Sequence, residues 1–148
     1  MSDTSYSAQY YKDLHRRVTE DLWNNGNLDA ASEHLHPELK AHQQAEGFGP
    51  DDLVRLVSEF REAFPDLEVT IERQIVEGDQ LASYTTFRGT HRGVLRGFQP
   101  TGQSVTMKGM CITDFVDGKV VNETVLYDQA DILRQLGGPG TFNVFARG

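Results

Sequence analysis

The spacing of apolar residues changes at Pro65, and this change does most to limit the folds open to the chain. Before Pro65, apolar residues recur three or four positions apart, as they do on one face of a helix. After it, Leu67, Val69 and Ile71 are separated by single polar residues, as they are in a half-buried strand. Helices followed by strands that pair with their neighbours predict an α+β domain.

Three helices are expected in the first half of the chain. The first carries an apolar stripe of Tyr11, Leu14, Val18 and Leu22 and ends at the segment NNGN, residues 24–27. The second is short and covers LDAASEHL, residues 28–35, and a short strand and a loop follow it. The third starts at Pro50, because proline and two acidic residues suit a first turn, and it ends before Pro65.

Four strands are expected after Pro65, at about 67–71, 81–87, 104–115 and 119–127, with a last helix near 130–136. Gly78-Asp79 and Asp117-Gly118 mark tight turns. Between the second and third of these strands, the segment RGTHRGVLRGFQPTGQ, residues 88–103, makes a long crossing that holds four glycines. The pattern predicts one curved sheet wrapped by the three helices, with a cavity between the layers that suits a small ligand.

Length, charge and cysteine content bound the class of protein. The 148 residues predict a single domain, 1–148, with a loose tail from about 138. A single cysteine excludes an internal disulfide, and no apolar run reaches the ~20 residues of a membrane span, so a cytoplasmic protein with no membrane association is expected. The net charge of −8 argues against nucleic-acid binding and favours a small organic partner.

Five segments together resemble a known family. FPDLEV, EGDQLA, RGTHRGVLRGFQPTG, VDGKVV and DILRQLG follow one another as they do in the SnoaL-like polyketide cyclase family of the nuclear transport factor 2-like superfamily. The resemblance covers residues 10–138. It implies a cone-shaped α+β barrel, with three N-terminal helices packed on a curved antiparallel sheet, an apolar pocket and a homo-oligomeric state. The superfamily includes cyclases, isomerases, dehydratases, epoxide-opening enzymes, hydroxylases and non-enzymes, so the fold alone does not fix the reaction.

The residues that aldol cyclases of this family use are replaced here. Those enzymes place an acid-base aspartate three residues before the aspartate that opens the C-terminal segment. Asp128 matches the second aspartate, which puts Val125 at the first position, and Cys111 stands where the resemblance implies a histidine. Valine cannot transfer a proton. The two replacements argue against a standard intramolecular aldol cyclisation.

Glu123 is the leading candidate for acid-base catalysis. If Val125 faces the cavity, as the resemblance implies, period two places Val121, Glu123 and Tyr127 on the same face. Apolar surroundings would raise the pKa of the Glu123 carboxyl toward neutrality, where it can donate or accept a proton. The alternative is that Glu123 points to solvent and forms an ordinary ion pair.

His91 and Asp128 are the other catalytic candidates. His91 is an imidazole that titrates near neutrality, and its alternative role is to tie down the glycine-rich crossing by a backbone hydrogen bond. Asp128 can act through a hydrogen bond to Tyr127 or His91, and its alternative role is to cap the last helix.

Substrate-binding candidates are drawn from the same strands and from the helices and loops above them. They are His42, Tyr84, Met107, Cys111, Val125, Tyr127, Trp23 and Phe60. A solvated loop is the alternative for His42, and a place in the core is the alternative for Tyr84, Trp23 and Phe60. No HExxH or CxxC spacing and no dinucleotide-binding context occur, so neither a metal nor a cofactor is expected.

Three functions follow from these residues. The first is a cofactor-independent cyclase or isomerase of secondary metabolism, which moves protons in an apolar, oxygenated substrate and catalyses cyclisation, epoxide opening with ring closure, or isomerisation. The second is a hydroxylase of the same family. The third is a non-catalytic binding protein, which an outward-pointing Glu123 would favour.

Overall fold

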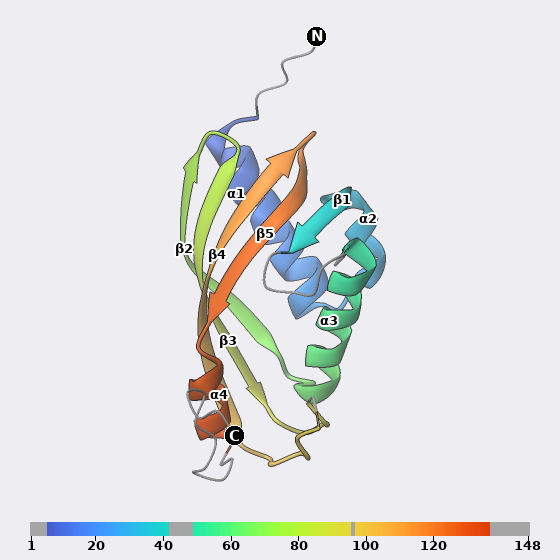
Figure 1. Cartoon of the computed structure of the whole chain (residues 1–148), viewed down its shortest axis with the longest axis vertical. Coiled ribbons are helices and arrows are strands. Elements are labelled where there is room, and N and C mark those ends of the chain that lie inside the picture. The colour runs from blue at the N-terminus through green and yellow to red at the C-terminus, as the bar shows by residue number, and fades with distance from the viewer. Residues whose placement is uncertain (1–5, 42–48, 96, 137–148) are drawn as a thin grey trace, which may run out of the picture.

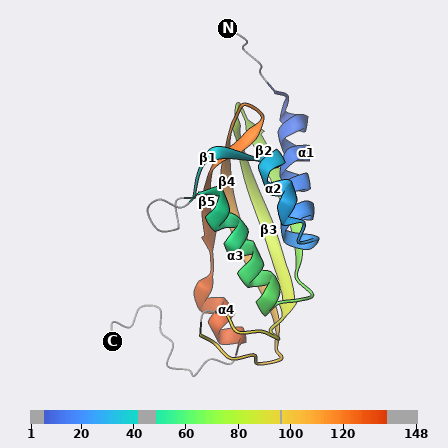
Figure 2. The ribbon, with the colours of Figure 1, turned by 90° about the vertical axis from the view of Figure 1, so that its right-hand side faces the viewer.

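The computed structural model describes residues 6–41, 49–95 and 97–136. It shows a layer of helices on one face of a curved five-stranded sheet, which confirms the expected α+β architecture (Figures 1 and 2). Within these ranges no helix is long and apolar enough to span a membrane.

The first helix, α1, covers Ala8–Val18 and continues directly into a π-helical turn, Thr19–Asn24. Ser7 caps it, with its Oγ accepting a hydrogen bond from the Tyr10 backbone N–H at 3.0 Å. The buried face of α1 holds Tyr11, Leu14 and Val18 of the expected apolar stripe and one residue that the stripe did not include, His15. Leu22, the last residue of the stripe, is buried in the π-helical turn.

The other helices of this layer are a 3-10 turn, Leu28–Ala30, α2, Ala31–His34, and α3, Pro50–Ala63. Pro50 opens α3 as expected, and the backbone N–H of Gly49 donates to Asp52 Oδ2 at 2.8 Å. The strand β1, Leu35–Ala41, leaves α2 directly. Figure 2 shows α1, α2 and α3 on the same side of the sheet.

The sheet has the order β1-β5-β4-β3-β2. Its longer strands are β2, Glu68–Glu77, β3, Gln80–Thr90, β4, Ser104–Val116, and β5, Lys119–Tyr127, and α4, Gln129–Gln135, follows them. These four strands are antiparallel as expected, but β1 pairs with β5 in parallel, so the sheet is mixed, and it does not close into a barrel. A parallel neighbour is possible here because α3 and three strands separate β1 from β5.

The turn between β4 and β5 is a tight two-residue turn, as the sequence predicts. Asp117 and Gly118 both have positive φ angles, 55° and 72°. Such a turn matches the right-handed twist of the two strands that it joins. It therefore supports the long hairpin on which Glu123 lies.

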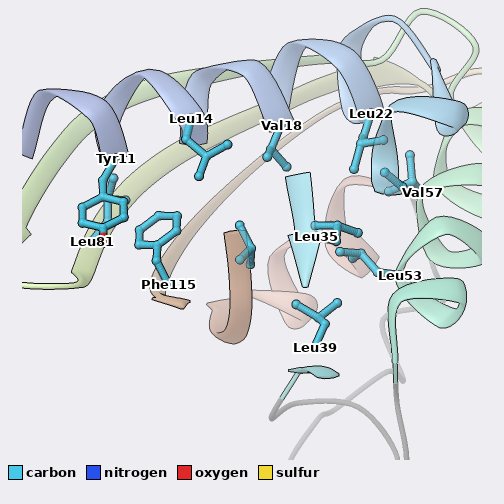
Figure 3. Close-up of a cluster of buried hydrophobic side chains, with 12 residues drawn as sticks. Tyr11, Leu14, Val18, Leu22, Leu35, Leu39, Leu53, Val57, Leu81 and Phe115 are labelled. Atoms are coloured by element: carbon cyan, nitrogen blue, oxygen red, sulfur yellow. The ribbon is translucent and has the colours of Figure 1, made fainter. Parts of the chain in front are cut away.

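Two clusters of apolar side chains fill the space between the layers. The first lies under α1 and is made of the residues in Figure 3, among them Leu14, Val18, Leu53, Leu81 and Phe115. The second surrounds Phe60 and reaches α4 through Ile132 and Leu136. Trp23 and Leu56 pack against both clusters, so these two side chains mark the place where the clusters meet.

The crossing between β3 and β4 folds back onto the end of α3. The backbone N–H groups of Arg92 and Gly93 both donate to the Ala63 carbonyl, at 2.9 and 3.1 Å. A Cβ at position 93 would lie 2.4 Å from the Glu62 carbonyl oxygen, so this contact requires glycine. The crossing is therefore anchored to the helical layer.

Candidate active site

A cavity of about 130 Å³ lies between the helices and the sheet. Its wall is largely apolar, and no lysine or arginine is among the described residues that line it. Those residues are His15, Val18, Thr19, Trp23, Leu53, Leu56, Phe60, Val69, Ser83, Thr85, Phe87, Met107, Gly109, Cys111, Glu123, Val125 and Tyr127.

Strand pairing builds the sheet side of the cavity. Ser83 pairs with Cys111 and Cys111 pairs with Val125, so one row of side chains crosses three strands. Glu123 pairs with Thr113 in the next row and shares this face with Val125. The register shifts next to this row, because Asp114 pairs with Asn122 and Phe115 with Val120. Val121 lies at this irregularity, which interrupts the alternation of β5, and it is not among the lining residues.

The π-helical turn builds the opposite wall with Thr19 and Trp23. Arg61 fixes its end, because Nη1 donates to the carbonyls of Trp23 and Asn24 at 2.6 and 2.8 Å. The Asn24 side chain accepts from the Val69 N–H at 2.6 Å and donates to the Val69 carbonyl at 3.1 Å. The turn is thus joined to both α3 and β2, and π-helical turns are frequent at functional sites.

Among the described residues that line the cavity, Glu123 is the one that carries a carboxyl group. Its side chain is half-buried, and burial raises its pKa to about 7. Near neutral pH both forms of this carboxyl are therefore populated. It can accept a proton and can also donate one, as acid-base catalysis requires.

Cys111 on β4 is an ionisable residue that the charge of Glu123 affects. Burial, and then the negative charge of Glu123, raise the pKa of its thiol, and Sγ lies 3.6 Å from Thr113 Oγ1. The thiol therefore stays protonated and serves as an apolar part of the wall rather than as a nucleophile.

His15 is a cavity residue that the sequence analysis did not select. It is 8 % exposed, and its Nδ1 lies 2.9 Å from Gln74 Nε2. Burial lowers its pKa to about 4, with a smaller contribution from Arg16. The signal for it was present, since position 15 lies four residues after Tyr11 and three before Val18, on the same helical stripe.

Ser83 and Thr85 were missed as well. Both lie on β3, two residues apart and on the face of Phe87. The Ser83 hydroxyl oxygen is buried and has no hydrogen-bond partner among the described residues. It is therefore open to a ligand that can hydrogen-bond to it.

Most of the predicted binding residues line the cavity. They are Trp23, Phe60, Met107, Cys111, Val125 and Tyr127. Tyr84 does not, because it lies on the opposite face of β3, where the Lys108 Nζ is 5.9 Å from its ring centroid. His42 lies outside the described residues.

Neither His91 nor Asp128 is among the residues that line the cavity. His91 is fully buried in the crossing, and its Nδ1 accepts a hydrogen bond from the Thr101 N–H at 3.2 Å. Asp128 caps α4 and accepts from the Asp131 N–H at 3.0 Å. These contacts are the structural alternatives that the sequence left open for the two residues.

Across the part of the chain that the structure describes, no group of three His, Cys, Asp or Glu side chains is placed to hold a metal ion.

Comparison with known proteins gives the family. The model of the SnoaL-like polyketide cyclases matches residues 13–136, which is most of the chain. The chain belongs to this family. No curated protein matches this SnoaL-like chain.

Solved structures agree with the fold of this SnoaL-like protein. TsrD from Streptomyces laurentii is 22 % identical with a TM-score of 0.83, and the match covers 90 % of this chain and 98 % of TsrD. AclR from Streptomyces galilaeus, a candidate hydroxylase, is 30 % identical with a TM-score of 0.77, over 89 % and 87 % of the two chains. IdmH from Streptomyces antibioticus, a candidate polyketide cyclase, is 25 % identical with a TM-score of 0.75, over 85 % and 97 %.

Proposed function

We propose that this protein is a cofactor-independent cyclase or isomerase of secondary metabolism, which acts on a small apolar, oxygenated substrate. The observation that carries the proposal is Glu123, a carboxyl with a pKa of about 7 on the wall of an apolar cavity. An outward-pointing Glu123 would have favoured a non-catalytic binding protein, but the side chain lines the cavity.

Glu123 supplies both proton transfers that such a reaction needs. As a carboxylate it removes a proton from a carbon beside a carbonyl group, or from a hydroxyl group that attacks an epoxide. As a carboxylic acid it returns that proton to the product. The apolar walls hold the substrate in a folded conformation close to the reacting geometry, which lowers the entropic barrier to ring closure.

The position of the carboxyl favours a reaction other than the standard aldol cyclisation. Val125 stands where the resemblance implies the family's aspartate, and Glu123 lies two residues before it on the same face of β5. The acid-base group is therefore displaced by about 7 Å along the strand. Epoxide opening with ring closure, or isomerisation, fits this displaced group.

Deuterium exchange tests the proton transfer without knowledge of the natural substrate. β-Tetralone is a neutral aromatic ketone, and NMR follows the loss of its acidic C–H signal in D₂O buffer. We expect the wild-type protein to accelerate this exchange above the buffer rate, and Glu123→Gln to reduce the acceleration by roughly 100-fold or more, because the amide keeps the shape but takes no proton.

The controls separate this role from folding and from other acids. Glu59→Gln removes an exposed carboxyl on α3 and should leave exchange unchanged. The rate should rise with pH and level off above about 7, as Glu123 ionises. Three other ionisable residues among those described line the cavity, and they are His15, Cys111 and Tyr127. In this pH range His15 stays neutral and Cys111 stays protonated. Tyr127→Phe tests whether the Tyr127 hydroxyl contributes to the exchange. Unchanged exchange in Glu123→Gln would falsify the proposal.

A hydroxylase is the second candidate, and the similarity to AclR favours it. A hydroxylase would add one oxygen atom to its substrate, whereas the proposed reactions only rearrange atoms. Mass spectrometry of the products formed with and without O₂ distinguishes the two candidates. A product heavier by one oxygen atom would favour the hydroxylase.

The cytoplasmic location stays a prediction. We also propose that the protein forms a homodimer through the outer face of the sheet. On this face of β4, Met110 and Ile112 are 60 % and 48 % exposed, between Lys108 and Asp114. A two-fold axis in the interface plane between Met110 and Ile112 would place the Lys108 of one copy opposite the Asp114 of the other. This charge complementarity makes a second copy of the chain the expected partner.

A further inference from the structure

We propose that His15 donates a hydrogen bond from its Nε2 to the carbonyl oxygen of the substrate, with Gln74 holding the imidazole in the tautomer that can do so. The inference rests on the proposed function, because it names the substrate group that is polarised while Glu123 moves the proton. His15 lines the cavity from the helical side and Glu123 from the sheet side, so one ligand can contact both walls.

The contacts of Gln74 fix which nitrogen of His15 carries the hydrogen. Gln74 Nε2 lies 3.1 Å from the Lys12 carbonyl oxygen and 2.9 Å from His15 Nδ1. An amide NH₂ group has two hydrogens, and one goes to each of these atoms. Nδ1 of His15 is then an acceptor, so in a neutral ring the hydrogen is on Nε2.

The reverse orientation of the Gln74 amide is excluded by the Lys12 carbonyl. With the amide turned over, Oε1 of Gln74 would face that carbonyl oxygen, and two acceptors would meet with no hydrogen between them. In the observed orientation Oε1 is buried without a partner among the described residues. Gln74 Oε1 is therefore left unsatisfied, at a cost in stability. The NH₂ group meanwhile donates to the Lys12 carbonyl and to His15 Nδ1.

The surroundings keep the ring uncharged. His15 is 8 % exposed, and the adjacent Arg16 adds a positive charge that disfavours a second one on the ring. The helix itself is braced at this point, because Thr19 Oγ1 donates to the His15 carbonyl at 2.9 Å. A neutral imidazole fixed in this way serves as a hydrogen-bond donor rather than as an acid.

The donor stabilises the charge that proton removal creates. The Glu123 carboxylate takes the proton from the carbon beside the carbonyl, and the electron pair of that C–H bond forms a C=C bond. The carbonyl π pair moves to oxygen, which becomes an enolate oxygen hydrogen-bonded to the Nε2–H of His15. The protonated Glu123 then returns the proton to carbon at the same or another position, and His15 stays neutral throughout.

The substrate class follows from this pair of groups. It is a neutral, apolar molecule with a carbonyl group and an acidic C–H beside it, because the cavity has no lysine or arginine among the described lining residues to bind an anionic group. A preorganised donor of this kind acts on the enolate more strongly than on the ketone. Loss of it should slow proton exchange about 100-fold or more.

The infrared spectrum of a bound ketone tests the hydrogen bond directly. The probe is β-tetralone labelled with ¹³C at its carbonyl, and its stretching band is compared with that of the free ketone in an apolar solvent. We expect a shift to lower frequency in the wild-type protein and in Glu123→Gln. His15→Phe, which keeps the bulk of the ring, should return the band to its unbonded position while the ketone remains bound.

Two further variants give the control and the positioning test. Thr85→Val removes a hydroxyl group from the cavity wall but leaves the His15 imidazole in place, so it should keep the shifted band. Gln74→Leu removes the amide that selects the tautomer, so the band should split into bonded and unbonded components. If His15→Phe does not fold, the ¹⁵N NMR spectrum of the wild-type imidazole still tests the proposal, since the proposal requires a neutral ring with its hydrogen on Nε2.

The possible failures are distinguishable. A shifted band with no exchange in the wild-type protein would leave the hydrogen bond standing and overturn the acid-base role of Glu123. Exchange with an unshifted band, a band that stays shifted in His15→Phe, a hydrogen on Nδ1, or no binding of β-tetralone to the wild-type protein would each overturn the inference for His15.

Discussion

At the scale of single residues, burial favours the neutral form of two ionisable groups that line the cavity, Glu123 on the sheet and His15 on α1. It raises the pKa of Glu123 to about 7 and lowers that of His15 to about 4. Between these two values the carboxylic acid and the uncharged imidazole coexist without an ion pair. The cavity therefore stays apolar enough for a neutral substrate, yet keeps one group that can exchange a proton.

Replacing Glu123 by glutamine should stabilise the protein at alkaline pH. The folded-state pKa, about 7, lies above the reference value of 4.5, so the folded state binds more protons than the unfolded state between these values. Wild-type stability therefore falls as pH rises through this window, and the variant does not share that loss. Urea unfolding at pH 5 and pH 8 should show a relative gain for Glu123→Gln of about 2–3 kcal/mol at the higher pH.

Other titrating groups cancel in this comparison because both proteins contain them. His15 acts in the opposite direction in each protein, since its folded-state pKa lies below the reference value and its contribution to stability is lost as pH falls below 6.5 toward 4. A difference in unfolding free energy between wild type and Glu123→Gln that does not change with pH would contradict the burial of the carboxylate.

At the scale of helices and strands, the sequence predicted some faces and left others undecided. On β5 the alternation of Glu123, Val125 and Tyr127 is clear once one of them is placed in the cavity. On β3 both sets of alternating residues contain aromatic and hydroxyl side chains, so hydrophobic periodicity does not select a face. Pairing with β4 selects it, and this is why Ser83 faces the cavity while Tyr84 does not.

Long-range contacts explain the rest of what the sequence did not predict. The bond between His15 and Gln74 joins residues 59 positions apart, and the π-helical turn depends on Arg61 and Val69, which lie on other elements. The parallel pairing of β1 with β5 is likewise set by how the layers pack. Local propensity carries no record of such contacts, whereas it predicted the helices, the tight turns and the positions of the four later strands along the chain.

Replacing His91 by alanine should loosen the crossing between β3 and β4 more than it affects the cavity. The ring is fully buried, packs 5.6 Å from the Phe64 ring and accepts the Thr101 N–H. Its loss leaves a void and an unsatisfied donor, so the free energy of unfolding should fall by about 2–4 kcal/mol. Thermal unfolding measured beside tetralone exchange below the melting range checks this, and loss of exchange in a folded His91→Ala would restore a catalytic role.

Replacing Asn24 by alanine should weaken the junction between the π-helical turn and β2. The side chain satisfies both the N–H and the carbonyl of Val69, at 2.6 and 3.1 Å. Truncation leaves both groups without these partners and should lower the free energy of unfolding by about 2 kcal/mol. Because Trp23 and Val69 both line the cavity, ligand affinity should fall as well.

Urea unfolding and calorimetric titration with β-tetralone measure the two effects of Asn24→Ala. Asn25→Ala is the matched control, since Asn25 is exposed and adjacent. Equal stability of Asn24→Ala and Asn25→Ala would show that the bonds to Val69 contribute little.

At the scale of the whole molecule, the two faces of the sheet differ, because helices cover only one of them. Helices cover one face of the sheet (Figure 2). The cavity lies on that side, while the outer face carries exposed apolar side chains. Met110 pairs with Tyr84 on one side and with Leu126 on the other, so these side chains form one continuous row across three strands. A contiguous apolar row on an open sheet face is a feature of interaction surfaces.

The proposed dimer makes a prediction that a single charge on this row can test. Leu126 is 67 % exposed and lies beside Met110, so Leu126→Lys would bring a positive charge from each subunit into the apolar centre of the interface. Light scattering after size exclusion should show a dimer for the wild type and a monomer for Leu126→Lys. Val94→Lys is the matched control, because Val94 is 54 % exposed but belongs to the crossing rather than to the sheet. Since the cavity lies on the other side of the sheet, the monomeric variant should keep its tetralone exchange. A monomeric wild type would contradict the proposed dimer, and dimer loss in Val94→Lys alone would place the interface elsewhere.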